Sequence, residues 1–132
     1  MKKLYPLFVV LFLISNGFGQ KLHESIETYE SGNIKSITYH KKTGNRIEIV
    51  KEEGYYQNGQ KRQEGNYKDG KKEGLYVWWH ENGEKSIEGN YKSGTNDGLG
   101  IWWHKNGKKK KEINYKDGKK VGLQTEWHEN GQ

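Results

Sequence analysis

The sequence contains no cysteine, and its single proline and all three phenylalanines fall within the first 18 residues. Without cysteine the chain has no disulfide to stabilise a thin core, no cysteine nucleophile and no lipid-modified cysteine anchor. Beyond Pro6 no proline interrupts a strand ladder. Hydrophobic residues make up only 30% of the chain. We therefore expect the tyrosines and tryptophans beyond residue 19 to supply most of the buried surface.

The first 19 residues have the features of a secretory signal peptide. Lys2 and Lys3 precede a short apolar run, Leu4–Ile14, and small residues follow it up to Gly19. The run is much shorter than the roughly 20 residues of a membrane-spanning helix, and this order of features is typical of a cleaved signal. We predict that residues 1–19 are removed, that the chain is exported to the periplasm or beyond the cell, and that the mature chain has no transmembrane helix.

The charge balance is mildly basic. The whole chain has 23 Lys+Arg and 17 Asp+Glu, a formal net charge of +6. Removing Lys2 and Lys3 leaves 21 basic residues against 17 acidic ones, or +4. This charge suits a soluble protein and permits an acidic partner. Because the predicted signal exports the chain, we expect no nucleic-acid partner.

A 24-residue repeat is the dominant pattern of the sequence. Asn-Gly, Tyr-Lys-Asp/Ser-Gly and Gly-Leu each recur at this spacing. The markers are Asn58-Gly59, Asn82-Gly83, Asn106-Gly107 and Asn130-Gly131; Tyr67, Tyr91 and Tyr115; and Gly74-Leu75, Gly98-Leu99 and Gly122-Leu123. Three independent markers in one register predict an array of structural repeats.

The predicted mature chain has two parts. Residues 55–132 hold the regular repeats, the last of which is partial. Residues 20–54 form an N-terminal segment with a degenerate copy near Tyr29, whose turn glycine, Gly32, lies 27 residues before Gly59. Terminal repeats are commonly atypical because they cap the stack.

Each unit reads as two strands and two turns. Asn-Gly predicts a type I′ turn, which needs φ > 0 at both central residues, and Asp69-Gly70 and Asp117-Gly118 are similar turn signals. The segments between turns, such as Lys85–Tyr91 and Leu99–His104, have a normal strand length. No stretch has a helical apolar period. The sequence therefore predicts an all-β, single-domain protein of repeated β-hairpins.

Alternation along each strand predicts which side chains share a face of the sheet. Leu75, Val77 and Trp79 fall on one face, and the later repeats have apolar or similar residues at the same positions. We predict that this face forms the core, with strand glycines that leave room for aromatic rings. The predicted core residues are the leucines, tryptophans and tyrosines of this face: Leu75, Trp79, Leu99, Trp103, Leu123, Trp127, Tyr67, Tyr91 and Tyr115.

The opposite face is less regular and more polar. Its aromatic and histidine side chains are our candidate binding surface, because rows of exposed aromatic residues are typical of interfaces. These residues are Tyr76, Trp78, His80, Trp102 and His104. The alternative interpretation is that the sheet curls over them or that a partner copy covers them.

The densest basic cluster follows the Asn106-Gly107 turn. It consists of Lys108, Lys109, Lys110 and Lys111, together with Lys105 just before the turn. One interpretation adds these lysines to the candidate binding surface, as a contact for anionic lipid headgroups or an acidic protein. The other is a solvated strand in which lysines discourage edge-to-edge pairing.

The sequence contains no arrangement of residues typical of a metal or catalytic site. His80, His104 and His128 recur every 24 residues, but equivalent positions in neighbouring repeats lie about 9–10 Å apart. That is too far for imidazoles to share a zinc ion held at about 2.0–2.1 Å. The serines have no nucleophile-elbow motif, and no glycine-rich loop opens a helix. We predict no metal, no cofactor and no enzymatic activity.

The repeats resemble the MORN repeat in the variant form found in many bacterial proteins. The matching stretches are Gly65–Gly70 followed by Gly74-Leu75, Gly89–Gly94 followed by Gly98-Leu99, and Asn114–Gly118 followed by Gly122-Leu123. Ile113 replaces the glycine of the pattern in the third copy. The resemblance implies an elongated, twisted antiparallel sheet of stacked hairpins. It also implies contact with proteins or membrane lipids, and some bacterial proteins with this repeat are named antitoxins.

These observations support one main hypothesis and two alternatives. The main one is an exported, non-catalytic scaffold of the bacterial envelope that binds a protein partner, with homodimerisation through an open sheet edge as a further expectation. The first alternative is an immunity or antitoxin-like inhibitor of a toxin, which rests on the resemblance. The second is a glycan- or lipid-binding surface module, which rests on Trp78, Trp102 and the lysine cluster. A shared fold does not decide among them.

Overall fold

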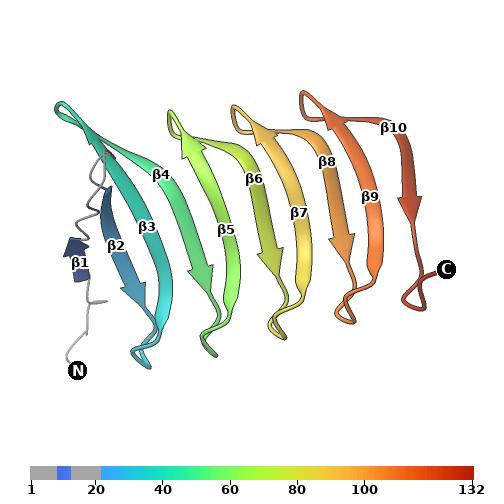
Figure 1. The fold of residues 1–132 in the computed structure, drawn as a ribbon, viewed down its shortest axis with the longest axis horizontal. Helices are drawn as coiled ribbons and strands as arrows, with labels where there is room; N and C mark the ends of the chain where they lie inside the picture. Colours follow the sequence, from blue (N-terminus) through green and yellow to red (C-terminus); the bar gives the residue numbers. More distant parts are fainter. Residues whose placement is uncertain (1–8, 13–21) are drawn as a thin grey trace, which may run out of the picture.

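The protein forms one open antiparallel sheet (Figure 1). The computed structural model describes residues 9–12 and 22–132, so the predicted signal peptide lies, apart from residues 9–12, outside the described residues. Within these ranges ten strands follow one another in chain order and no helix occurs. The all-β prediction is confirmed.

Every strand pairs with its neighbours in the chain, and from β2 onward each connection is a hairpin. The strands are β1 Val9–Phe12, β2 Leu22–Thr28, β3 Ile34–Thr43, β4 Arg46–Tyr55, β5 Lys61–Lys68, β6 Lys71–Trp79, β7 Lys85–Lys92, β8 Thr95–Trp103, β9 Lys109–Lys116 and β10 Lys119–Glu126. Figure 1 shows them side by side along the long axis of the molecule, with the turns in two rows. Only local pairings are needed to build this topology.

The turns of one row, which lead into β6, β8 and β10, are type I′. Asp69, Ser93 and Asp117 have φ of 50°, 49° and 47°, and the glycine after each also has positive φ. Two successive residues in the left-handed region match the right-handed twist of the paired strands. Asp-Gly and Ser-Gly therefore close the tight hairpins.

The prediction of type I′ turns at Asn-Gly is wrong. In the first regular copy, Gly59 has φ of 85° but Asn58 stays outside the left-handed region. Tyr56 N–H donates to Gln60 O at 2.8 Å, and Gly59 N–H donates to Tyr56 O at 2.9 Å, so the loop is longer than a two-residue turn. The reason lies in the asparagine side chain, because Asn58 Oδ1 accepts the Gln60 N–H at 3.0 Å and holds a local Asx turn.

The same asparagines join one repeat to the next. Asn58 Nδ2 donates to Glu81 O at 3.1 Å, and Asn82 Nδ2 donates to Lys105 O at 2.8 Å. Asn106 continues this ladder toward the C-terminus. Each turn is thereby fixed to its neighbour by a hydrogen bond that contributes about 1 kcal/mol.

A β-bulge in each hairpin decides which side chains share a face. The pairing of β5 with β6 shifts after Gly65, which lies opposite Tyr76, while Tyr67 lies opposite Lys72. Directly opposed residues share a face, so Tyr67 lies with Tyr76 and not with Leu75. The predicted grouping of the repeat tyrosines with the leucines is wrong for this reason.

The leucines predicted in the core are exposed. Leu75 is 45% exposed, and Leu123 is 89% exposed. Leu75 follows Gly74, which has φ of 76° and lies in the bulge that the β5 pairing skips. The buried hydrophobic side chains of the described residues are Ile26, Tyr76, Val77 and Ile113. A single-layer sheet packs side chains between neighbours along one face, which leaves few positions fully enclosed.

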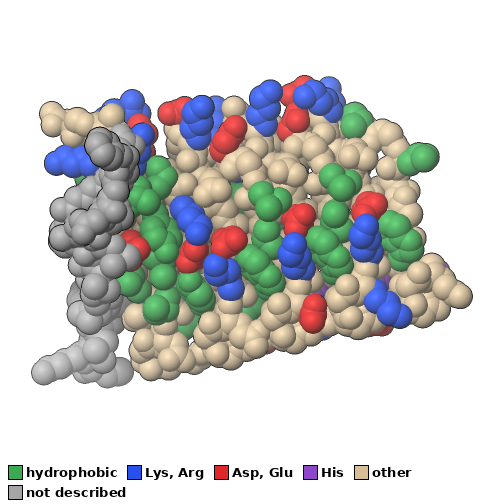
Figure 2. All heavy atoms as spheres, in the orientation of Figure 1, with side chains coloured by type: hydrophobic (Ala, Val, Ile, Leu, Met, Phe, Trp, Pro, Cys, Tyr) green, Lys and Arg blue, Asp and Glu red, His purple; other side chains and the backbone are tan. Residues whose placement is uncertain are grey.

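We name the two faces by their side chains. The aromatic face carries Tyr67, Tyr76, Trp78, Tyr91, Trp102 and Tyr115. The Lys–Glu face carries Val77, Trp79, Trp103 and Trp127 with the lysines and glutamates paired beside them. Figure 2 shows the Lys–Glu face, where basic and acidic side chains recur in pairs between hydrophobic ones.

Candidate binding groove on the aromatic face

One end of the aromatic face is closed by Tyr76. Its ring lies directly over Gly65, where an added Cβ would meet ring carbons at 2.1–2.3 Å. The ring centroids of Trp78 and Tyr91 lie 5.2 and 5.4 Å from that of Tyr76, and Tyr67 packs edge-on at 6.0 Å. Tyr76 is 1% exposed, and burial raises the pKa of its hydroxyl. This cluster needs a glycine at residue 65 because any side chain there would displace the ring.

The ammonium group of Lys72 completes this cluster. Lys72 Nζ lies 4.4 Å from the ring centroid of Tyr76, 5.3 Å from that of Trp78 and 5.2 Å from that of Tyr91. A cation within about 6 Å of an aromatic face is attracted by the ring quadrupole. Three rings therefore share one ammonium group.

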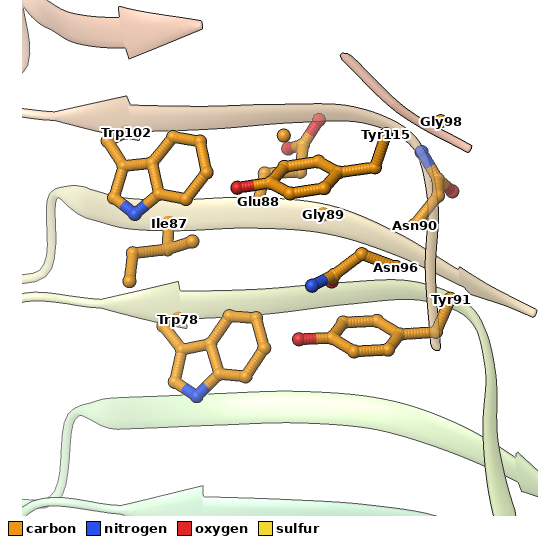
Figure 3. A pocket seen from close by; sticks show the side chains of 11 residues that line it. Trp78, Ile87, Glu88, Gly89, Asn90, Tyr91, Asn96, Gly98, Trp102 and Tyr115 are labelled. Carbon is orange, nitrogen blue, oxygen red and sulfur yellow. The ribbon is translucent and has the colours of Figure 1, made fainter. Parts of the chain in front are cut away.

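The next part of the same face is open. A cavity of about 200 Å³ lies over the backbone of Gly89 and Gly100, which are paired across β7 and β8. Figure 3 shows Trp78 beside Tyr91 along one side and Trp102 beside Tyr115 along the other, with Ile87 and Asn96 between them. We call this cavity the aromatic groove. The aromatic side chains, Ile87 and Asn96 in this lining are half-buried, so they are held in place but reachable.

The backbone positions the walls of the groove. Trp78 and Trp102 both pair with Ile87, on either side of β7, so all three side chains point to the same face. Tyr91 and Asn96 pair directly at the other end. Beyond Gly100, Ile113 on β9 lies opposite that glycine and is 3% exposed. Ile113 takes the place of a repeat glycine on the strand next to the groove.

Of the predicted surface residues, Trp78 and Trp102 lie in this groove. Tyr76 does not, and its prediction as an exposed binding residue is wrong, because Gly65 lets its ring sink onto the sheet. His80 and His104 lie at strand ends, where their Nε2 atoms are 3.1 Å from Trp103 O and Trp127 O. The histidines thus join successive repeats and do not line the groove.

The lysines of the predicted basic cluster interact with different partners. Lys108 Nζ donates to Asn130 O at 2.9 Å, and Lys109 forms an ion pair with Glu112. Lys111 pairs with Glu126 at 2.7 Å, while Lys110 is exposed. Most of these charges are therefore matched locally and do not form one basic patch.

The Lys–Glu face repeats a regular set of contacts. Lys61 pairs with Glu64 at 2.6 Å, and Lys85 pairs with Glu88 at 2.6 Å. The lysines of this set also lie near the tryptophan at the open end of the same hairpin. The ammonium-to-ring distances are 5.9 Å for Lys61 and Trp79, 5.6 Å for Lys85 and Trp103, and 5.8 Å for Lys109 and Trp127. The tryptophan rings of this face therefore lie beneath lysine ammonium groups that are paired with glutamates.

A buried carboxylate, that of Glu53 on β4, lies on the same face, N-terminal to these Lys–Glu pairs. Glu53 is 7% exposed and occupies the position that Val77 has one repeat later. It accepts hydrogen bonds from Lys51 Nζ and Tyr55 Oη, both at 2.6 Å, and Lys61 lies nearby. Burial alone would raise the pKa of Glu53, but these donors and charges lower it to about 2. Sequence alternation had no signal for this site, although a glutamate at a valine position of the repeat marks it.

Clusters suited to metal binding are missing from the described ranges. Within residues 9–12 and 22–132, no three histidine, aspartate or glutamate side chains converge to hold an ion. In the same ranges we find no helix with the length and hydropathy of a membrane span.

Comparison with known families identifies the repeat. Residues 50–69, 72–93 and 96–117 match the MORN repeat variant. This chain contains three MORN repeats of the variant type. Such repeats are non-catalytic modules for protein or membrane interaction. Comparison with curated proteins and with solved structures gives no significant match.

The aromatic groove lies between the second and third MORN repeats. Trp78 and Tyr91 belong to the second, whereas Asn96, Trp102 and Tyr115 belong to the third. Alternation along the strands predicts the two tryptophans but not Asn96 or the open floor over Gly89. A comparison of the repeats position by position would have found them, because residues 96 and 100 break the pattern set by residues 72 and 76.

Proposed function

We propose that this protein is an exported, non-catalytic MORN scaffold that binds a protein partner through its aromatic face. The aromatic groove carries the proposal. Its tryptophan N–H and tyrosine O–H groups form no hydrogen bond with the described residues, although the rings beneath them are half-buried. Tyrosine and tryptophan usually bond these groups once they are covered, and both are enriched where proteins meet.

The distribution of charge favours the same face. On the Lys–Glu face each tryptophan already lies under a lysine, and each of those lysines has a glutamate partner. Binding there would require those ion pairs to be broken or desolvated, which opposes association. Most of the lysines after Asn106 are paired in the same way, so they give weak support to a lipid-binding role. The aromatic groove needs no such rearrangement.

Export is proposed from the sequence of residues 1–19. N-terminal sequencing of the protein recovered from a cell-envelope fraction of its own host tests it. A chain that begins at Gln20 supports the proposal. A chain in the cytosolic fraction that still begins at Met1 would refute it.

Two adjacent tryptophans give a matched test of the binding face. Trp102 and Trp103 follow each other on β8 and point to opposite faces, and both are half-buried. Envelope extract is passed over immobilised wild-type protein, Trp102→Ala and Trp103→Ala, after circular dichroism has shown that both variants keep the wild-type spectrum. We expect one captured protein to be retained by wild type and Trp103→Ala and lost with Trp102→Ala.

The opposite result would move the binding site. Capture that survives Trp102→Ala and is lost with Trp103→Ala would place the partner on the Lys–Glu face. Capture lost with neither variant would exclude both tryptophans. The identity of the captured protein also tests the antitoxin-like alternative, because an inhibitor of this kind must retain a toxin.

A further inference from the structure

Four of the five tryptophans lie under a lysine ammonium group. Trp79, Trp103 and Trp127 have Lys61, Lys85 and Lys109, and Trp78 has Lys72 at 5.3 Å. Trp102 is the exception in the described part of the chain, where no ammonium group is found over its ring. Most tryptophans of this fold thus have a lysine ammonium group over the ring. Trp102, in the aromatic groove, has none within the described residues.

The 24-residue repeat shows what is missing. Trp78 and Tyr91 of the second repeat become Trp102 and Tyr115 in the third. The other two members of the cluster change, since Lys72 is replaced by Asn96 and Tyr76 by Gly100. The third repeat therefore keeps the aromatic walls and lacks both the ammonium group and the ring that fill the second.

The space left by these replacements is real. An added Cβ at Gly65 would collide with the Tyr76 ring at 2.1 Å, whereas one at Gly89, the equivalent residue one repeat later, has its nearest neighbour at 4.0 Å. The cavity of about 200 Å³ lies over Gly89. A side chain from outside can therefore occupy the place that Lys72 and Tyr76 fill in the preceding repeat.

We propose that the aromatic groove binds the ammonium group of a lysine side chain from the protein partner. This inference rests on the proposed function and names the chemistry of the same site. Lys72 is the internal example, because its Nζ lies 4.4–5.3 Å from three ring centroids in the equivalent position. In the groove, Trp102 and Tyr115 attract the cation, and the carbonyl of the Asn96 side chain accepts an N–H from it.

The remaining walls suit the rest of a lysine side chain. Ile87 lies between the two tryptophans and offers apolar surface to the methylene stem, as lysine stems commonly pack on such surface. Gly89 allows close approach to the backbone (Figure 3), while the rings of Trp102 and Tyr115 lie over Gly100, 3.0 and 3.4 Å from the position of an added Cβ. A neutral apolar side chain of the same length would fill the space but gain nothing from the ring quadrupoles.

The first test measures binding of small probes to the full chain by isothermal titration calorimetry. The probes are Nα-acetyl-lysine N-methylamide, its Nε-trimethyl form and the neutral norleucine analogue. We expect both cations to bind at one site and the norleucine analogue to bind at least about tenfold more weakly, the size of a desolvated cation–π contact. Equal binding of all three would overturn the ammonium assignment, as would binding of none.

The second test fills the groove from within. Asn96→Lys/Gly100→Tyr rebuilds the Lys72–Tyr76 pair, and its new tyrosine would lie over Gly89 as Tyr76 lies over Gly65. We expect this variant to lose about tenfold in affinity for both cations. Asn96→Lys alone is a milder form that keeps Gly100 if the double variant fails to fold. Asn66→Lys, which adds the same charge at an exposed position, is the control and keeps wild-type affinity.

The outcomes separate this inference from the proposed function. Partner capture that is lost with Trp102→Ala, together with no probe binding to wild type, would leave the binding face standing and refute the lysine ligand. Unchanged affinity of Asn96→Lys for the cations would refute the site itself. Preference for the trimethyl form by more than about tenfold would contradict a lysine side chain and indicate a quaternary ammonium ligand.

Discussion

The second and third MORN repeats share one backbone plan but fill it differently. In the second, Tyr76 covers Gly65 and Lys72 covers the rings, so the surface is closed. In the third, Gly100 and Asn96 leave the walls standing over an open floor. Strand pairing and turns are the same in both repeats. The comparison teaches that a repeat array can create a binding site by omitting side chains from one copy.

The third repeat compensates for part of this omission. Gly100 lies opposite Ile113, whereas the earlier copies have glycine at the Ile113 position, as at Gly89. The bulk that the second repeat places on its second strand is partly moved to the neighbouring strand in the third. Ile113 is buried, so the sheet keeps a packed side chain next to the groove. Local stability and an open site therefore coexist.

The largest expected effect is on the closed repeat. Tyr76→Ala should lower the free energy of unfolding by about 3–5 kcal/mol, the usual cost of removing a buried aromatic side chain. Trp102→Ala removes a half-buried ring beside an existing cavity and should cost less than half as much. Urea denaturation of both variants measures the difference. Similar losses would contradict the distinction between a closed and an open repeat.

The next effect uses two equivalent glycines. Gly65→Ala forces a methyl group into the Tyr76 ring and should destabilise the protein by about 1–3 kcal/mol, as overpacked cores do. Gly89→Ala meets open space and should change stability by less than about 0.5 kcal/mol. Thermal or urea unfolding of the pair gives the result. A larger loss for Gly89→Ala would mean that the groove floor is closed in solution.

A smaller effect compares Glu53 with the exposed pairs that follow it. The pKa of Glu53 is about 2 in the folded protein and lies near 4.5 for an ordinary glutamate, so its stabilisation is present above pH 4.5 and is lost as pH falls toward 2. With allowance for the solvent around Lys51 and Lys61, we expect a loss of about 1–2 kcal/mol over that range.

Denaturation at a series of pH values in wild type and Glu53→Gln checks this loss. The variant should be less stable at pH 7 and show a flatter acid limb. Glu88→Gln, which removes an exposed ion pair, should keep the wild-type acid limb. An acid limb that is unchanged in Glu53→Gln would remove Glu53 from the account.

The smallest effect concerns the ladder between turns. Asn82→Ala removes the donor to Lys105 O and the acceptor of the Glu84 N–H, and should cost about 1 kcal/mol. Asn130 Nδ2 donates to the Gln132 side chain of its own turn and not to another repeat, so Asn130→Ala should cost less. Equal costs in urea denaturation would show that the inter-repeat bond contributes little.

The sequence predicts the fold well because turn-forming residues recur at fixed positions in every repeat. Asp69, Ser93 and Asp117 with their glycines, and the four Asn-Gly pairs, mark every regular hairpin. The faces were assigned wrongly because a bulge at each Gly-Leu pair changes the partner of the following residues, and simple alternation does not count it. The turn type at Asn-Gly differs from the prediction because the asparagine side chain accepts the backbone N–H two residues later and holds a local Asx turn, which a search for two-residue turns does not consider.

The candidate site could be predicted in part. Trp78 and Trp102 were found as aromatic residues on the less regular face, and both line the groove. Tyr76 was placed with them by alternation, but its burial depends on Gly65 lying directly across the strand pair. The open floor follows from residues 96 and 100. A position-by-position comparison of the second and third repeats predicts it, because Asn96 and Gly100 replace Lys72 and Tyr76.

The most direct test of the account observes the five tryptophan side chains together. Their indole N–H signals in a two-dimensional NMR spectrum of ¹⁵N-labelled protein are followed as Nα-acetyl-lysine N-methylamide is added. We expect the Trp102 signal to shift most and the Trp78 signal next, while the signals of Trp79, Trp103 and Trp127, which lie under their own lysines, do not shift. Shifts led by Trp103 or Trp127, or no shift at Trp102 at saturating probe, would contradict it.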